Sequence, residues 1–164
     1  MDPGLSLAIH EVLPTEILEM IFKEHAMLEW EAPTIDGQVC RVWRRIVLST
    51  PRAWSYFEIR DDPMPSMGEV RMRLHRSSSA PLHIDIRADE DTCQRFYDLF
   101  SDHHTRIASL RMRYGSQSFF ERRDFPCMRL LDVVRWCPIR WGSMPKLQFL
   151  LLGGHYPGMM QLSE

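Results

Sequence analysis

The sequence predicts a mixed α and α/β chain, in which a small module of three helices precedes a series of short α/β units. Apolar residues recur with helical spacing between residues 13 and 54, and helical and extended segments alternate from residue 67 onward. Three of the later segments also share one apolar frame at nearly constant separation. The chain has 164 residues, of which 45% are hydrophobic, so it is large enough for one ordinary domain or two small ones.

The first helix is expected to begin at Pro14, because the fixed φ of proline suits the first helical position and its missing N–H is not needed there. Ile17, Leu18, Ile21 and Phe22 then recur at helical spacing, with charged residues at most of the other positions. This pattern predicts an amphipathic helix.

Residues 23–38 connect this helix to the next one. We expect Ala26 to Trp30 to form one or two helical turns before Pro33. The pair Asp36-Gly37 is typical of a turn that lets the next helix begin.

The next helix carries an apolar stripe of Val39, Trp43, Ile46 and Val47, and Pro51 ends it. A module of about forty residues rarely gains more than roughly 3 to 5 kcal/mol from its own core. Its surplus apolar surface must therefore be covered by the rest of the chain or by a partner.

Downstream, the apolar pattern predicts a strand over Tyr56 to Ile59, a proline-containing linker over residues 61–66 and a helix over residues 68–76. A strand over Leu82 to Ile86 and a helix over residues 91–100 follow.

Three segments then share the frame apolar-x-x-apolar-x-apolar, at offsets of 21 and 19 residues. They comprise Ile107, Leu110 and Met112; Met128, Leu131 and Val133; and Leu147, Leu150 and Leu152. Strands at a fixed period are typical of a leucine-rich repeat, in which each repeat adds one strand to a shared core. An ordinary three-stranded α/β domain is the alternative, since the Asn or Cys that closes the usual repeat is not at a matching position in all three copies.

Three short motifs occur in order in the helical module: LPTEILEMIF from Leu13 to Phe22, VCRVWR from Val39 to Arg44, and STPRAW from Ser49 to Trp54. Together they resemble the F-box motif. The run QVCRVWRRIVLSTPRAW is most similar to F-box proteins of mushroom-forming fungi, which continue into leucine-rich repeats after a link like RSSSAPLHI. The resemblance gives an F-box domain over residues 9–59 and a short, irregular leucine-rich-repeat-like α/β solenoid over residues 67–164.

The resemblance implies a substrate-receptor adaptor of a Skp-cullin-F-box ubiquitin ligase, acting in ubiquitin-dependent protein degradation. In this family the F-box binds a Skp-type linker protein, which binds the cullin scaffold, while the following domain holds a protein substrate. Carried over position by position, the linker-facing residues are Leu13, Pro14, Ile17, Leu18, Ile21, Phe22, Val39, Cys40, Trp43, Leu48 and Trp54. The substrate is not identified; exposed strand residues such as Arg111, Arg113, Asp132 and Arg135 are the kind that contact it.

The chain departs from the family in two respects. Thr34, Ile35 and Asp36 stand where relatives have an apolar stretch, which is expected to shorten the middle helix and weaken linker binding. The repeats also stop at Glu164 without a terminal cap, so we expect either a truncated platform or an edge that another chain covers.

Composition and charge exclude several other classes. The net charge of −2 gives no basic footprint for nucleic acid or an anionic membrane, and no run approaches the roughly 20 apolar residues that cross a bilayer. Asp2 and Glu11 interrupt any signal peptide. Since Cys40, Cys93, Cys127 and Cys137 lack paired C-x-x-C spacing, they are expected to be reduced, in the cytoplasm or nucleus.

Residues that favour catalysis are sparse. Asp102, His103 and His104 suggest a small hydrolase at most, and no third ligand stands at metal spacing near them. Asp85, Asp89 and Asp91 lack the glycine and closing glutamate of a calcium loop. We therefore expect no enzyme activity, cofactor or metal. A receptor subunit is the leading hypothesis, and a protein-interaction module that acts outside a ligase is the alternative.

Overall fold

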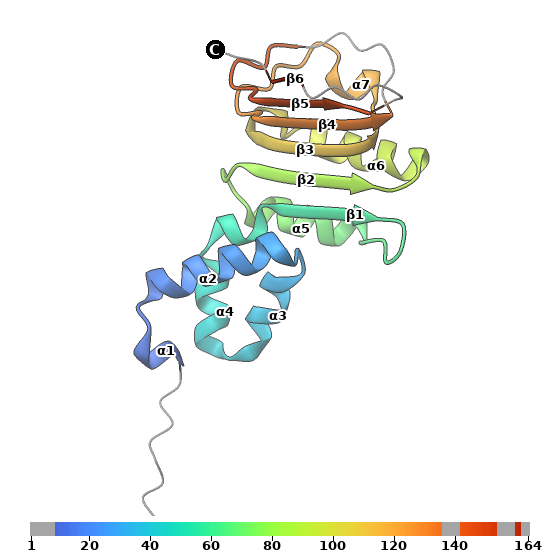
Figure 1. Cartoon of the computed structure of the whole chain (residues 1–164). Coiled ribbons are helices and arrows are strands. Elements are labelled where there is room, and N and C mark those ends of the chain that lie inside the picture. The colour runs from blue at the N-terminus through green and yellow to red at the C-terminus, as the bar shows by residue number, and fades with distance from the viewer. Residues whose placement is uncertain (1–8, 136–141, 154–159, 162–164) are drawn as a thin grey trace, which may run out of the picture. The chain divides into compact units, whose positions relative to one another are not determined.

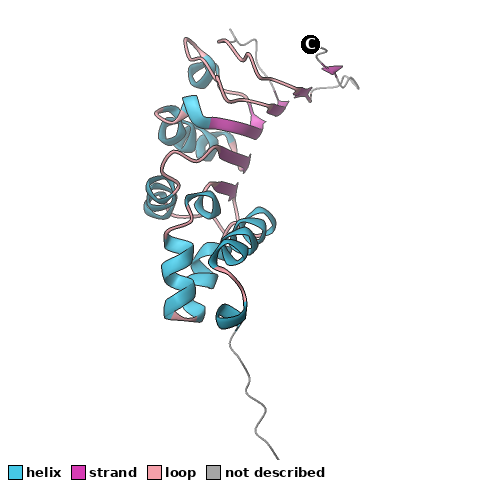
Figure 2. Cartoon of the chain, turned by 90° about the vertical axis from the view of Figure 1, so that its left-hand side faces the viewer, coloured by secondary structure: helices cyan, strands magenta, loops and turns pink. Residues whose placement is uncertain are grey.

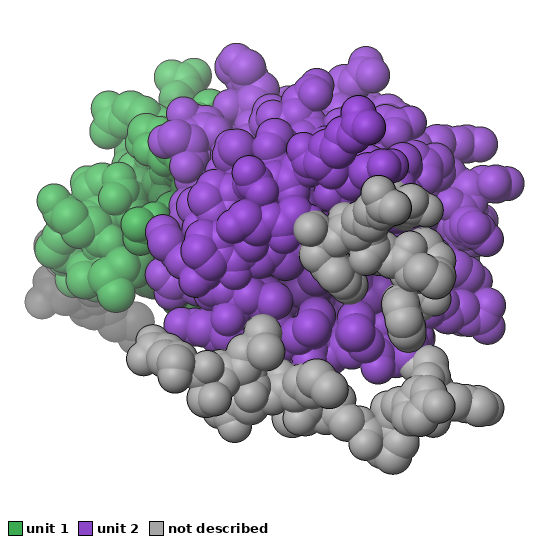
Figure 3. Space-filling view, turned by 90° about the horizontal axis from the view of Figure 1, so that it is seen from above, with its two compact units in different colours: residues 1–54 green, residues 55–164 purple. Residues whose placement is uncertain are grey.

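The computed structural model describes residues 9–135, 142–153 and 160–161 (Figure 1). The chain forms two compact units, residues 1–54 and residues 55–164, which Figure 3 distinguishes by colour. Unit 1 is helical, and unit 2 combines helices with a sheet that is parallel except at β6. The expected mixed α and α/β composition is therefore confirmed. Cys137 lies outside the described residues.

Unit 1 contains α1 (Ile9–Val12), α2 (Thr15–Leu28), α3 (Ala32–Val39), α4 (Arg41–Leu48) and the 3-10 turn η1 (Pro51–Trp54). Pro14 directly precedes α2, and its carbonyl accepts hydrogen bonds from the backbone N–H groups of Ile17 and Leu18. The predicted start of the first helix is thus correct to within one residue.

The middle of unit 1 differs from the prediction, because Asp36 and Gly37 lie inside α3 and not in a turn. Asp36 is only 4% exposed, and its side chain contacts His25 of α2. The Gly37 carbonyl accepts a 2.7 Å hydrogen bond from Nε of Arg44 on α4. These tertiary contacts outweigh the local turn preference, so the predicted turn at Asp36-Gly37 is wrong.

The following helix also begins later than predicted. Val39 ends α3, and Cys40 has an extended backbone that separates it from α4. The Sγ atom of Cys40 accepts a 3.4 Å hydrogen bond from the backbone N–H of Trp43 and so caps α4. The apolar stripe that seemed to run from Val39 to Val47 therefore belongs to two helices.

The core of unit 1 is built from one face of each longer helix and from η1. The indole Nε1 of Trp54 donates a 2.8 Å hydrogen bond to the Val47 carbonyl, and the rings of Phe22 and Trp43 meet edge to face at 5.1 Å. The buried apolar residues are Leu18, Phe22, Ala26, Ala32, Ile46, Val47, Ala53 and Trp54.

Unit 2 contains β1 (Tyr56–Arg60), α5 (Met67–Arg76), β2 (Leu82–Arg87), α6 (Glu90–Ser101), the 3-10 turn η2 (His104–Arg106), β3 (Ile107–Tyr114), α7 (Gln117–Phe120), β4 (Leu130–Arg135), β5 (Phe149–Leu152) and β6 (Met160–Gln161). The predicted strands and helices between residues 56 and 100 are confirmed to within one or two residues. Side chains of Ser66 and Asp89 cap α5 and α6, each accepting from the backbone N–H three residues later.

The strands lie in sequence order, with β1 to β5 parallel and β6 antiparallel to β5 (Figure 1). Residues from α5, α6 and α7 pack into one core with the buried face of the sheet, and Figure 2 shows helices on one side of the strands. The F-box domain predicted from the sequence extends to Ile59. In the structure β1 pairs with β2, so unit 1 ends at Trp54 and the strand belongs to unit 2.

The three-copy apolar frame matches the register of the sheet. Leu131 of β4 pairs with Leu110 of β3 and Leu150 of β5, and Val133 likewise lies between Met112 and Leu152. The first frame positions of the last two copies, Met128 and Leu147, precede their strands and follow equivalent turns closed by Met128 N–H to Phe125 O and Leu147 N–H to Met144 O. The repeated spacing therefore produces continuous apolar rows across the sheet.

Candidate functional site

Unit 1 exposes many large apolar side chains that its own core does not use. This exposed apolar set comprises Ile9, Val12, Ile17, Met20, Ile21, Met27, Leu28, Ile35, Val39 and Leu48. Exposure reaches 86% at Leu28 and 59% at Val39. A concentration of apolar surface on such a small helical unit is typical of a protein interaction site.

The helix α2 accounts for half of this set because it carries two apolar stripes. Leu18, Phe22 and Ala26 recur every four residues and are buried. Ile17, Ile21 and Leu28 recur at spacings of four and seven, so they share a neighbouring side of the helix, and all three are exposed. The apolar spacing did not separate the two stripes, and Leu28 was not among the predicted linker-facing residues, although its spacing from Ile17 and Ile21 is the signal that identifies it.

The predicted linker-facing residues fall into three groups by burial. Pro14, Ile17, Ile21, Val39 and Leu48 are exposed, and Leu13, Cys40 and Trp43 are half-buried. Leu18, Phe22 and Trp54 are buried. The exposed residues can contact a partner directly, while the buried ones can act only by holding the helices in place.

Trp43 belongs to the half-buried group. One side of its ring packs against Phe22, and its backbone N–H is held by Cys40. Its indole Nε1 is buried and has no hydrogen-bond acceptor among the described residues. Such an orphaned donor typically costs about 1–3 kcal/mol.

The pair of His25 and Asp36 joins α2 to α3. Nδ1 of His25 lies 3.1 and 3.2 Å from the two carboxylate oxygens of Asp36. Burial raises the pKa of Asp36, and the neighbouring His25 partly opposes this rise. The unusual acidic residue of the middle helix is therefore an internal contact and is not displayed on the surface.

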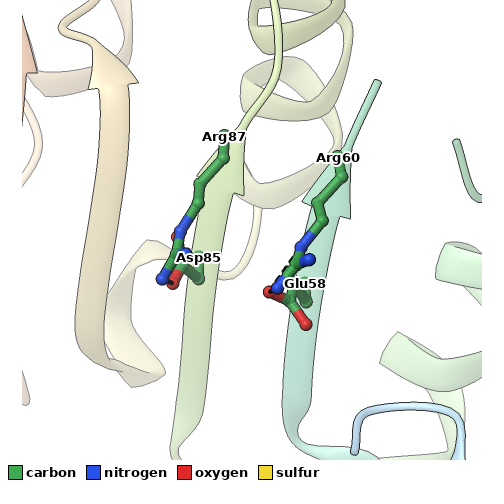
Figure 4. A network of polar contacts seen from close by, with 4 residues as sticks. All are labelled: Glu58, Arg60, Asp85 and Arg87. Carbon is green, nitrogen blue, oxygen red and sulfur yellow. Dashed lines mark hydrogen bonds and ion pairs between the residues drawn. The ribbon is translucent and has the colours of Figure 1, made fainter. Parts of the chain in front are cut away.

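A second candidate surface, which is polar, lies on the sheet of unit 2, opposite the face that packs against the helices. Glu58 of β1 and Asp85 of β2 are neighbours in register, and each contacts an arginine two residues along its own strand (Figure 4). Nε of Arg60 lies 2.7 Å from Glu58, and the guanidinium of Arg87 makes two hydrogen bonds of 3.0 and 2.7 Å to Asp85. The alternating Glu-x-Arg and Asp-x-Arg spacing that produces these pairs was not singled out in the sequence.

A hollow of about 430 Å³ lies beside these pairs, toward the carboxyl ends of β2, β3 and β4. It is lined by Asp85, Ile86, Arg87, Arg111, Met112, Arg113, Asp132 and Val134. Three of the four strand residues named as candidate substrate contacts, Arg111, Arg113 and Asp132, are therefore together. Arg135 lies against the ring of Tyr114, 5.4 Å from its centroid.

The residues that suggested catalysis or metal binding have structural contacts. His104 Nδ1 lies 2.9 Å from the Ser101 carbonyl, and its ring meets Phe125 edge to face. Burial lowers the pKa of His103, and Asp89 caps α6. Among the described residues, no group of three or more His, Cys, Asp or Glu side chains is arranged to hold a metal ion. Cys40, Cys93 and Cys127 carry thiols and not disulfides.

In the described part of the chain, no helix has the length and apolar character needed to span a membrane. Comparison with protein-family models, with curated proteins and with solved structures finds no match to this chain.

Proposed function

We propose that this chain is a substrate-receptor subunit of a Skp-cullin-F-box ubiquitin ligase. Unit 1 acts as the F-box and binds a Skp-type linker protein, and through it a cullin scaffold. Unit 2 acts as a leucine-rich-repeat-like platform that holds a protein substrate.

The observation that carries this proposal is the exposed apolar set of unit 1. The unit already has a core, so the side chains exposed on α2, α3 and α4 are surplus to its own packing. Apolar and aromatic anchors supply most of the binding energy in protein interfaces. Four of the predicted linker-facing residues, Ile17, Ile21, Val39 and Leu48, belong to this set.

The acidic substitution in the middle helix does not count against linker binding. Asp36 is buried against His25, and α3 still presents Ile35 and Val39 to solvent. We therefore expect the linker surface to be apolar at α3, despite the change in sequence.

Linker binding is tested by co-purifying the full chain with a Skp-type linker protein. The double variant Ile17→Asp and Val39→Asp places charges at two exposed positions, so it should fold normally and bind at least about tenfold more weakly. These positions are better probes than Trp43, whose replacement would also disturb the contact with Phe22.

The control is Met64→Asp, the same change at an exposed position of unit 2. It should leave linker binding unchanged, and thermal unfolding should confirm that each variant is folded. Undiminished co-purification of a folded Ile17→Asp and Val39→Asp variant would contradict the proposal.

A further inference from the structure

The polar face of the sheet has a regular charge pattern that changes at β3. On β1 and β2 a carboxylate is followed two residues later by an arginine, and the two pair along the strand (Figure 4). On β3 the corresponding positions are Arg111 and Arg113. Because the carboxylate is replaced by a second arginine, the strand carries two cations and no carboxylate to neutralise them.

Neighbouring strands compensate only one of these two arginines. Arg111 is in register with Asp85 on β2 and with Asp132 on β4. Asp132 is half-buried, and attraction to Arg111 offsets part of the rise that burial causes in its pKa. Because Asp85 is already paired with Arg87, Asp132 on the adjacent strand, about 4.8 Å away, is the carboxylate that compensates Arg111.

Arg113 has no such compensation. The carboxylate of Asp85 is already bound by Arg87 in a two-fold contact. Beyond β3, the next strand presents Val134 two residues after Asp132, and this side chain is 52% exposed. Among the described residues, no carboxylate forms an ion pair with Arg113.

The hollow thus contains Arg87, Arg111 and Arg113 against Asp85 and Asp132, with the surplus positive charge at Arg113 and an apolar side chain beside it. We propose that this hollow binds an acidic segment of the substrate polypeptide, with a Glu or Asp carboxylate on Arg113 and a neighbouring aliphatic side chain on Val134. The term substrate rests on the proposed function, whereas the preference for an acidic peptide rests on the charges alone.

The same charges argue against a nucleic acid as the occupant. A polyanion laid along this face would bring its phosphates close to Asp85, Asp132 and Glu58. One carboxylate matches a local surplus of one positive charge, and planar guanidinium groups bind carboxylates with two parallel hydrogen bonds.

The test measures binding of labelled peptides to the full chain by fluorescence anisotropy. The probes are repeats of Gly-Glu-Leu-Ser, Gly-Gln-Leu-Ser and Gly-Lys-Leu-Ser, together with a single-stranded oligonucleotide. The Glu peptide should bind more tightly than the other three probes, and added salt should weaken the binding of the Glu peptide.

The main variant is Arg113→Glu, with Arg113→Gln as a milder change should the first be poorly folded. Arg113→Glu should weaken binding of the Glu peptide by about tenfold or more, because two negative charges then face each other. The same variant should bind the Lys peptide more tightly. Arg71→Glu is the matched control, since this exposed arginine lies on α5, the helix that covers the opposite face. It should change neither affinity.

Three results would overturn the proposal: equal binding of the Glu and Gln peptides, equal effects of Arg113→Glu and Arg71→Glu, or tighter binding of the oligonucleotide. Linker co-purification of the same variants separates the two proposals. If the Arg113→Glu variant still binds the linker protein but no longer binds the Glu peptide, both the ligase function and the acidic-peptide surface stand. If the wild-type chain binds the Glu peptide through Arg113 but never the linker, the surface stands and the ligase function fails.

Discussion

His25 of α2 and Asp36 of α3 form a pair that links these two helices, with Nδ1 of His25 lying 3.1 Å from one carboxylate oxygen and 3.2 Å from the other. Asp36 is almost fully buried, whereas the His25 side chain is 42% exposed. The acid therefore depends on the histidine for the contact that makes its burial acceptable.

The first prediction concerns the strength of this dependence. His25→Ala leaves the Asp36 carboxylate buried without this partner, so it should lower the free energy of unfolding by about 1–3 kcal/mol. Asp36→Ala combined with His25→Ala should cost less than the sum of the two single changes, because the second change removes the orphaned acid. Urea unfolding of the three variants measures this coupling, and strictly additive effects would show that the pair contributes no mutual energy.

The second prediction concerns pH. Burial raises the pKa of Asp36, so the carboxyl group of Asp36 binds a proton more tightly in the folded chain than in the unfolded chain. Between the ordinary carboxyl pKa of about 3.9 and the raised value, the contribution of Asp36 to stability falls as pH rises. Compared with Asp36→Asn, the wild-type chain should therefore gain stability as the pH is lowered through this window.

Asp89 provides the contrast of opposite sign. Its hydrogen bonds to Thr92 at the start of α6 lower its pKa. The contribution of Asp89 to folding stability is therefore present above the ordinary carboxyl pKa and is lost as pH falls through the lowered pKa. Urea unfolding over a pH series should show opposite slopes for Asp36→Asn and Asp89→Asn relative to wild type; slopes of the same sign would contradict the assignment.

The third prediction tests the apolar rows of the sheet. Leu131 is fully buried between Leu110 and Leu150, so Leu131→Ala should cost about 2–5 kcal/mol. Leu151→Ala is the control, because this half-buried leucine lies one residue from Leu150 and therefore on the opposite face. Its cost should be clearly smaller when both variants are compared by urea unfolding, and equal costs would mean that the row is not the core of the sheet.

Much of the local structure was predictable because it depends on periodicity. The alternation in Leu82 to Ile86 and the repeated frame through Leu110, Leu131 and Leu150 require no distant information. The errors occurred where a side chain's partner lies elsewhere in the chain. Asp36 and Gly37 have turn propensity, but contacts with His25 and Arg44 keep them helical.

The candidate sites show the same division. Spacing alone identified Ile17, Ile21 and Val39 as apolar positions of the helical module, but it did not separate them from Leu18 and Phe22, which α2 turns inward. Arg111 and Arg113 were recognisable as exposed strand residues. Their imbalance of charge depends on which strands flank β3, and strand order is not written in any single segment.

The sequence by itself determined the periodic elements of this protein: amphipathic helices in the first third, then strands whose apolar residues recur at intervals that a parallel sheet can align. Tertiary structure decided which apolar stripe of α2 is buried, that β1 joins the sheet of unit 2, and that Arg113 stands beside Val134 without a carboxylate. The physical reason is that periodicity arises from neighbours along the chain, whereas burial and charge compensation arise from neighbours in space.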